Sequence, residues 1–260
     1  MPEFGLLLIG DELLSGRRQD KHLPKVIELL RQKGLALSWM HCLGDDRERL
    51  IQELKSLFSS SDIVLCCGGI GSTPDDHTRQ SAAAALNLPL VLHEEARELI
   101  LQRAQEMASE KGEPLDENAP ETLIRLEMGR FPQGAKIIPN PYNKIPGFSF
   151  ANIHFMPGFP VMAWPMMEWV LEHNYAHLFS DITHVEHSVI LPGAREAVLT
   201  PLMQRIEETF SGVKVFSLPS VDHPKYGACI ELGVKGEEKV AVLAFDFMLK
   251  ELNKMKIQVL

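Results

Sequence analysis

A run of glycines, hydroxyls and carboxylates between residues 68 and 78 has the residue types best suited to chemistry. It reads Gly68-Gly69-Ile70-Gly71-Ser72-Thr73-Pro74-Asp75-Asp76-His77-Thr78, after an apolar run and before a helical pattern. Glycines let backbone N–H groups face an anion, and the start of a helix adds a favourable dipole. Aspartates supply hard oxygen ligands for Mg²⁺ or Mn²⁺, which proteins often bind partly through phosphates. The run therefore predicts a site for phosphate and a divalent cation.

The roles expected within this run follow from side-chain type. Asp75 and Asp76 are the candidates for metal binding and for catalysis by water activation. Thr78 would support the loop, and the candidates for binding phosphate are Gly68, Gly69, Gly71, Ser72 and Thr73. Pro74 stands where a dinucleotide fingerprint has its third glycine, and no Gly-Lys-Ser/Thr of a Walker A loop follows. The alternative is a helix start with Asp76 as N-cap, which leaves the three glycines unexplained.

A second loop with adjacent carboxylates follows the first apolar run and spans residues 10–16. Asp11 or Glu12 could bind a metal or a ribose hydroxyl, and Gly10 would let a ligand approach the backbone. The alternative is a loop whose aspartate caps a helix.

A third loop lies within residues 155–160 and contains Pro157 and Gly158. It again falls between a predicted strand and a predicted helix, so both residues could form another wall of the same site. The alternative is a simple Pro-Gly turn.

The surrounding pattern predicts elements that would bring these loops together. Apolar runs over 6–9, 35–40 and 62–67 are predicted as strands. Between them, apolar residues recur at helical spacing over 23–30 and 50–58. This β-α-β-α-β order predicts a sheet with parallel strands and helices on both faces. In such sheets the ligand site lies at the carboxyl ends of the strands.

The rest of the chain is predicted as two further blocks. Helices are expected over 76–86, 94–111, 119–128 and 159–179, a strand over 136–138 and a hairpin over 148–155. After about residue 180 the pattern changes to β-α-β-β-α, which has the size of a small α+β companion domain. We therefore expect an α/β domain over residues 1–178 and a small α+β domain over residues 179–260.

Composition narrows the expected partners and location. The 260 residues carry 26 Lys+Arg and 35 Asp+Glu, a net charge of −9. Binders of duplex nucleic acid or of anionic membranes normally carry a basic excess, so neither partner is expected. The N-terminus lacks a cationic start and a long apolar stretch, so no signal peptide or membrane span is predicted. The 4 cysteines have neither disulfide-framework nor metal spacing, which favours a reduced, cytoplasmic protein.

Together the three loops resemble the molybdopterin-binding (MoaB/Mog-like) domain, in the branch found at the N-terminus of CinA competence/damage-inducible proteins. The resemblance covers about residues 4–170 and includes Gly44-Asp45-Asp46, Pro139-Asn140-Pro141 and Pro146-Gly147. It implies a three-layer α/β/α fold. The tail from about residue 180 resembles the small α+β domain that follows in CinA proteins, and we expect no room for their C-terminal amidase domain.

The resemblance also implies a phosphorylated pterin or nucleotide as ligand. The wider family binds and adenylylates molybdopterin, and the CinA branch is associated with hydrolysis of a nucleotide diphosphate such as ADP-ribose. We therefore expect metal-dependent hydrolysis of a nucleotide-sugar pyrophosphate, ADP-ribose first. The expected ions are Mg²⁺, Mn²⁺ or Co²⁺, with potassium, and the expected metal ligands are Asp75, Asp76 and Asp11.

Two alternatives stay open. The first is molybdopterin binding or adenylyl transfer. The second is a non-catalytic nucleotide-binding module, motivated by Met162, which stands where the branch commonly carries an acid. The resemblance further implies a homo-oligomer, either a dimer or a trimer.

Overall fold

The computed structural model describes residues 2–180 and 184–260. These residues form two compact units, one ending at Phe179 and the other beginning at Ser180, one residue from the predicted border. Among the described residues, no helix has the length and apolar character needed to cross a membrane.

The first unit is built on a six-stranded sheet with the order β2-β1-β3-β8-β7-β6. β1 pairs in parallel with both β2 and β3, and β3 pairs in parallel with β8, whereas β7 and β6 are antiparallel to their neighbours. The strands are β1 (Phe4–Ile9), β2 (Leu37–Leu43), β3 (Ile63–Cys67), β6 (Lys136–Ile138), β7 (Gly147–Phe150) and β8 (Ile153–Met156). The parallel core predicted from the first three strands is confirmed, and the hairpin extends it with antiparallel strands.

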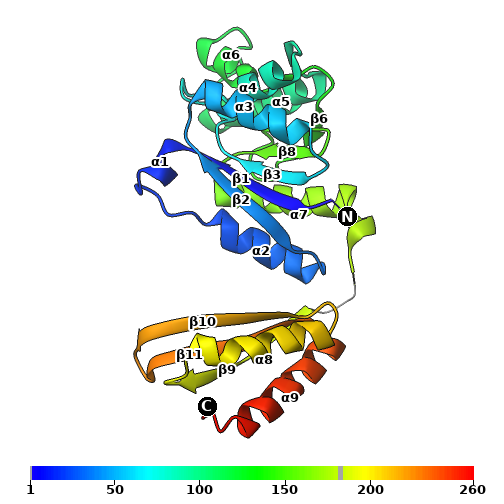
Figure 1. The fold of residues 1–260 in the computed structure, drawn as a ribbon. Coiled ribbons are helices and arrows are strands. Elements are labelled where there is room, and N and C mark those ends of the chain that lie inside the picture. The colour runs from blue at the N-terminus through cyan, green and yellow to red at the C-terminus, as the bar shows by residue number, and fades with distance from the viewer. Residues whose placement is uncertain (1, 181–183) are drawn as a thin grey trace. The chain divides into compact units, whose positions relative to one another are not determined.

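Alternation along β1 explains why helices cover both faces of this sheet (Figure 1). Leu6 and Leu8 belong to the core under α2 and α7, while Leu7 and Ile9 belong to the core under α3, α4 and α5. The helices of this unit are α1 (Asp11–Leu14), α2 (His22–Gln32), α3 (Arg47–Phe58), α4 (Thr78–Leu86), α5 (Glu94–Lys111), α6 (Pro120–Glu127), α7 (Pro160–Asn174) and the short 3₁₀ helix η1 (Ala176–Leu178). A strand buried on both sides is what a helix-covered parallel sheet requires, so the three-layer α/β/α prediction is confirmed.

Some elements differ from the prediction. Strands β4 (Leu90–Leu92) and β5 (Arg130–Pro132) form a separate antiparallel pair, and three residues are too few to show strand alternation in a sequence. Helix α4 begins at Thr78 instead of Asp76, because the Asp76 N–H closes a turn within the preceding loop. Helix α7 ends at Asn174, earlier than predicted.

The second unit is a three-stranded antiparallel sheet with the order β10-β11-β9. Its apolar core lies between the sheet and the helices α8 and α9. The elements are β9 (His184–Pro192), α8 (Glu196–Thr209), β10 (Lys214–His223), β11 (Gly227–Glu237) and α9 (Glu238–Lys254). This is the predicted β-α-β-β-α order, and the predicted α+β class is confirmed.

Phe148 offers a direct test of the core of the first unit. Its fully buried ring stacks on Phe155 at 4.4 Å and on Phe131 at 4.7 Å between ring centroids. We expect Phe148→Ala to lower the free energy of unfolding by about 3–5 kcal/mol. Leu123→Ala, at a side chain 49% exposed, should cost less than about 0.5 kcal/mol. Tryptophan fluorescence during urea unfolding reports on this unit alone, because all 3 tryptophans lie in it. An equal loss of unfolding free energy in the two variants would contradict the stacking of Phe148 in the core.

Candidate functional site

The structure brings the three predicted loops together at the carboxyl ends of β1, β3 and β8. The Gly68 N–H donates to the Met156 carbonyl at 3.0 Å, which ties the end of β3 to the end of β8. A Cβ atom on Gly68 would lie 2.0 Å from the Ile9 carbonyl oxygen, and one on Gly158 would lie 3.6 Å from the Gly68 Cα atom. Only a residue without a side chain allows the backbone at Gly68 to approach Ile9 this closely, whereas a Cβ atom on Gly158 would make an ordinary van der Waals contact.

The carbonyl groups of the glycine loop, residues 68–78, are held by hydrogen bonds from the start of α4. The Thr78 hydroxyl donates to the Gly68 carbonyl at 3.0 Å, and the Thr78 N–H donates to the Gly69 carbonyl at 3.0 Å. The buried Arg79 guanidinium donates to the carbonyls of Gly71 and Glu127. These bonds turn the carbonyls of the loop toward the protein.

Within the same loop, the N–H groups of residues 69–72 differ from those of Gly68, Thr73, Asp76 and Thr78, which all donate to the protein. Among the residues that the structure describes, none accepts a hydrogen bond from the N–H groups of residues 69–72. Successive free N–H groups in a turn form an anion-binding concavity, because their partial positive charges add at one point. The loop can therefore offer several donors to a phosphate.

Asp76 and Asp75 occupy different environments. The Asp76 carboxylate accepts hydrogen bonds from the Thr73 N–H at 2.8 Å and from the Thr73 hydroxyl at 2.5 Å, so it closes the loop on itself. Asp75 is exposed, and the Thr73 hydroxyl and the Asp75 amide hold the pKa of its carboxyl below the usual value. Asp75 is thus ionised and open to solvent at neutral pH.

The loops after β1 and β2 meet through two aspartates. The Asp11 N–H donates to the Asp45 carboxylate at 2.9 Å, and the Asp45 N–H donates to Asp11 Oδ1 at 3.2 Å. A Cβ atom on Gly44 would lie 2.3 Å from Asp11 Oδ1, so glycine leaves room for this carboxylate. The two loops are therefore held side by side by reciprocal hydrogen bonds.

Four carboxylates form what we call the acidic rim: Asp11, Glu12, Asp45 and Asp75. Burial raises the pKa of Asp45; a hydrogen bond from the Asp11 N–H opposes this, and the negative charges of the other three raise the pKa further. The described residues include no group of three His, Cys, Asp or Glu side chains that converges as a metal site. The predicted metal ligands are therefore split, with Asp11 and Asp75 on the rim and Asp76 bound to Thr73.

Sequence reasoning missed several residues that shape the site. Arg79 directly follows Thr78, but its burial has no sequence signature because arginine is usually exposed. His22 on α2 is buried, and its Nε2 lies 3.0 Å from the Gly158 carbonyl oxygen. The Arg18 guanidinium lies 5.8 Å from the centroid of the exposed Phe159 ring, beside the loop with Pro157 and Gly158. The Gly44-Asp45-Asp46 motif did signal Asp45, whereas Asp46 caps α3.

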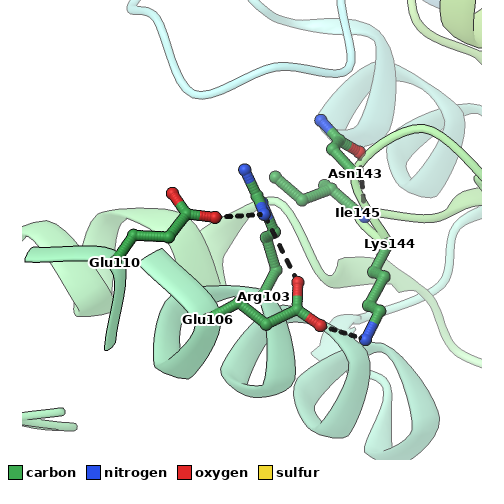
Figure 2. A network of polar contacts seen from close by, with 6 residues as sticks. All are labelled: Arg103, Glu106, Glu110, Asn143, Lys144 and Ile145. Carbon is green, nitrogen blue, oxygen red and sulfur yellow. Dashed lines mark hydrogen bonds and ion pairs between the residues drawn. The ribbon is translucent and has the colours of Figure 1, made fainter. Parts of the chain in front are cut away.

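A further motif segment, residues 140–147, is fixed by polar contacts, and Figure 2 shows those of Asn143 with Ile145 and of Lys144 with Glu106. The buried Asn140 amide donates to Asn143 Oδ1 at 2.8 Å and to the Ile145 carbonyl at 2.9 Å. Lys144 has a left-handed backbone with φ of 62° and forms an ion pair with Glu106 on α5. The Asn143 amide contacts Met162 at 3.6 Å, which places this segment beside the start of α7.

Gly68 and Gly16 form a matched pair for testing the close approach. Both have positive φ, 115° at Gly68 and 69° at Gly16, but a Cβ atom on Gly16 would meet nothing within 4 Å. Gly16→Ala should cost about 1–2 kcal/mol of unfolding free energy from backbone strain alone. Gly68→Ala should cost at least about 2 kcal/mol more, because the Cβ atom clashes with backbone. Urea unfolding measures both, and equal costs would contradict the contact with Ile9.

Asp45 supplies a test of the acidic rim through pH. Its raised pKa means that the folded state favours the protonated carboxyl, so ionisation at neutral pH costs stability. Asp45→Asn keeps an acceptor for the Asp11 N–H but cannot ionise. We expect this variant to be more stable than the wild type at neutral pH, with the gain vanishing below the ordinary aspartate pKa of about 3.9. Thermal unfolding measures the stability of both variants between neutral pH and pH values below the ordinary aspartate pKa, with Asp116→Asn, outside the rim, as the control. If the stability gain of Asp45→Asn does not change with pH, the raised pKa of Asp45 is wrong.

Relatives and a solved structure show what the chain is similar to. A CinA-like protein of Anaeromyxobacter dehalogenans (strain 2CP-C) is 33% identical over 178 residues, which cover 66% of this chain and 41% of that relative. The match therefore spans about two-fifths of that relative's length. A protein of Caldivirga maquilingensis is 27% identical over 244 residues, 90% of each chain. The crystal structure of the protein CinA with unknown function from Thermoplasma acidophilum has a TM-score of 0.54 at 22% identity, over 65% of this chain and 96% of that one.

The sequence profile of one family covers most of the first unit. The family is described as "Probable molybdopterin binding domain", and its profile matches residues 5–177. This range contains all three loops of the site and ends close to Phe179, where the first unit ends. The chain therefore belongs to this molybdopterin-binding domain family.

Proposed function

We propose that the site binds a phosphorylated pterin of the molybdopterin class, with the phosphate on the glycine loop. The observation that carries this proposal is the orientation of the loop, whose carbonyls are tied inward while the N–H groups of residues 69–72 have no acceptor among the described residues. Membership of the molybdopterin-binding domain family supports the pterin class of ligand. The same proposal extends to adenylyl transfer to this ligand.

The chain's own groups would bind and orient this ligand. The free N–H groups of the loop would donate to phosphate oxygens, and Thr78 and Arg79 would keep the loop in the donating orientation. The exposed ring of Phe159, 52% accessible, lies beside the same edge and could stack against a planar ligand ring. The Arg18 guanidinium near that ring adds a cation suited to an anionic ligand.

The acidic rim favours a second candidate, metal-dependent hydrolysis of a nucleotide-sugar pyrophosphate such as ADP-ribose. Carboxylates beside a phosphate repel it unless a cation lies between them. Mg²⁺ is usually bound through one or two carboxylates together with substrate phosphates, so Asp11 and Asp75 would hold it with ligand oxygens. Such an ion would neutralise phosphate charge and polarise the phosphorus centre. A non-catalytic nucleotide-binding module would use the same donors without turnover.

The exposed Asp75 distinguishes these candidates, because the hydrogen bonds from Thr78 and Arg79 to the loop carbonyls do not involve it. If phosphate binds the loop directly, Asp75→Asn removes a repulsion and should tighten molybdopterin binding by about two- to fivefold. If a metal bridges the ligand, the same variant should weaken Mg²⁺-dependent binding and abolish turnover. Asp222→Asn, exposed in the second unit, is the charge-matched control.

The measurement combines binding and turnover on the same preparations. Pterin fluorescence reports molybdopterin binding with and without Mg²⁺, and phosphate-bond hydrolysis is assayed on ADP-ribose, FAD and NAD with Mg²⁺, Mn²⁺ or Co²⁺ and potassium. Saturable molybdopterin binding without hydrolysis supports the first proposal. Turnover of ADP-ribose that Asp75→Asn abolishes supports the second, and neither binding nor turnover would refute both.

We also propose that the protein forms a homo-oligomer, a dimer or a trimer, as the family resemblance implies. Sedimentation equilibrium of the full chain measures this directly. A monomer at all concentrations would refute it.

A further inference from the structure

A cavity lies at the end of the central sheet opposite to the glycine loop. Its volume is about 770 Å³, within the range of small-molecule sites. The start of β3, the turn between β7 and β8 and the residues after α7 contribute to its lining, which includes Ile63, Lys136, Ser149, Asn152, Tyr175 and His177. Ile63 begins β3 and Asn152 directly precedes β8, so the cavity lies at the amino ends of these two parallel strands and is separate from the site described above.

A buried chain of hydrogen bonds ends at this cavity. Ser149 Oγ lies 2.7 Å from His154 Nδ1, and His154 Nε2 lies 2.7 Å from the Tyr175 hydroxyl. All three side chains are more than nine-tenths buried, and both Ser149 and Tyr175 line the cavity. The Tyr175 ring is held edge-on by Phe4, at 6.0 Å between ring centroids. These three hydrogen-bonded side chains are therefore a fixed part of the cavity wall.

Ser149, His154 and Tyr175 together carry three hydrogen-bonding protons but form only two hydrogen bonds with one another, so one proton is left over. Burial lowers the pKa of His154 to about 3 and raises the pKa of Tyr175 to about 12, so the imidazole is neutral and the phenol keeps its proton. A neutral imidazole has one N–H and one acceptor nitrogen. If Ser149 donates to His154, then His154 donates to Tyr175 and the phenolic proton is left over. In the other tautomer Tyr175 donates to His154, His154 donates to Ser149, and the serine proton is left over.

The strand register adds a cation beside this spare donor. Lys136 on β6 lies directly opposite Ser149 on β7, and Ser149 lies directly opposite His154 on β8. Residues directly opposite in antiparallel strands share a face, so the three side chains project on the same side of the sheet. The described residues that line the cavity include Lys136 and His177 but no Asp or Glu. In a protein with a net charge of −9, this local excess of donors and positive charge favours an anion.

We propose that this cavity is a second ligand site, which binds a small organic anion through the leftover hydroxyl proton of the Ser149–His154–Tyr175 chain and the ammonium group of Lys136. A carboxylate or a phosphate ester has the required acceptor and charge. Asn152 and Asn174 line the same cavity, and the side-chain amide of an asparagine can donate to further oxygens. This inference does not depend on the function proposed for the glycine loop.

Nitrogen-15 spectra of the histidine rings test the proposal on the full chain. His154 is recognised because its ring stays neutral at acidic pH, where an ordinary histidine is protonated. Citrate and inorganic phosphate are the probes, each titrated at ionic strength matched with potassium chloride. We expect a saturable shift of the His154 ring nitrogens, because an acceptor at one end of the chain selects one tautomer. The probe that binds with the higher affinity identifies the preferred anion as a carboxylate or a phosphate.

Variants assign the response to this cavity. Lys136→Gln should lower the binding affinity for the probe about tenfold, as expected for the loss of one charge-assisted contact. Lys55→Gln, an exposed lysine on α3, and Asp75→Asn, at the other end of the sheet, should leave the response unchanged. Tyr175→Phe should abolish the tautomer selection, and Lys136→Gln keeps the proposal testable if this buried variant fails to fold. No shift with either probe, or an equal response in Lys136→Gln, would overturn it.

Discussion

The direction of the peptide groups in the glycine loop depends on two buried polar residues at the start of α4. Thr78 binds the carbonyl of Gly68 through its hydroxyl and that of Gly69 through its N–H, and Arg79 binds that of Gly71. Burying an arginine is costly unless its donors are used, and here the backbone carbonyls of Gly71 and Glu127 use them. These carbonyls therefore bind the protein, while the N–H groups of residues 69–72 have no acceptor among the described residues.

The charge of the site follows from the same arrangement of strand ends. Parallel strands place their carboxyl ends at one edge, which brings the loops after β1, β2 and β3 together and with them the carboxylates of the acidic rim. Burial and this crowding of negative charge raise the pKa of Asp45, so the N–H groups of residues 69–72 share this end of the sheet with a cluster of carboxylates. In the first proposal a phosphate would use these amides directly, and in the second a cation would lie between the phosphate and the carboxylates.

The sequence predicted most of the strands and helices, but not the hydrogen bonds between the loops, and this difference has a physical cause. Apolar runs predicted the strands of the parallel core, and the glycines after β1 and β3 predicted turns at their ends, because strand burial and tight turns leave local signatures. The partners of Asp45, Asp76 and Arg79 were not predictable, because hydrogen bonds between loops have no periodicity. The Ser149–His154–Tyr175 chain was missed for a related reason: it depends on the register of β7 against β8 and on where α7 ends.

The most direct test of the central claim is a titration of the full chain with molybdopterin, followed by the backbone amide resonances of residues 69–72. Binding through the glycine loop predicts that these amide protons move downfield together, as N–H groups do when they donate to phosphate oxygens, while the amides of the second unit stay unchanged. Saturable binding that leaves residues 69–72 unmoved would contradict the claim that the free amides of this loop hold the ligand.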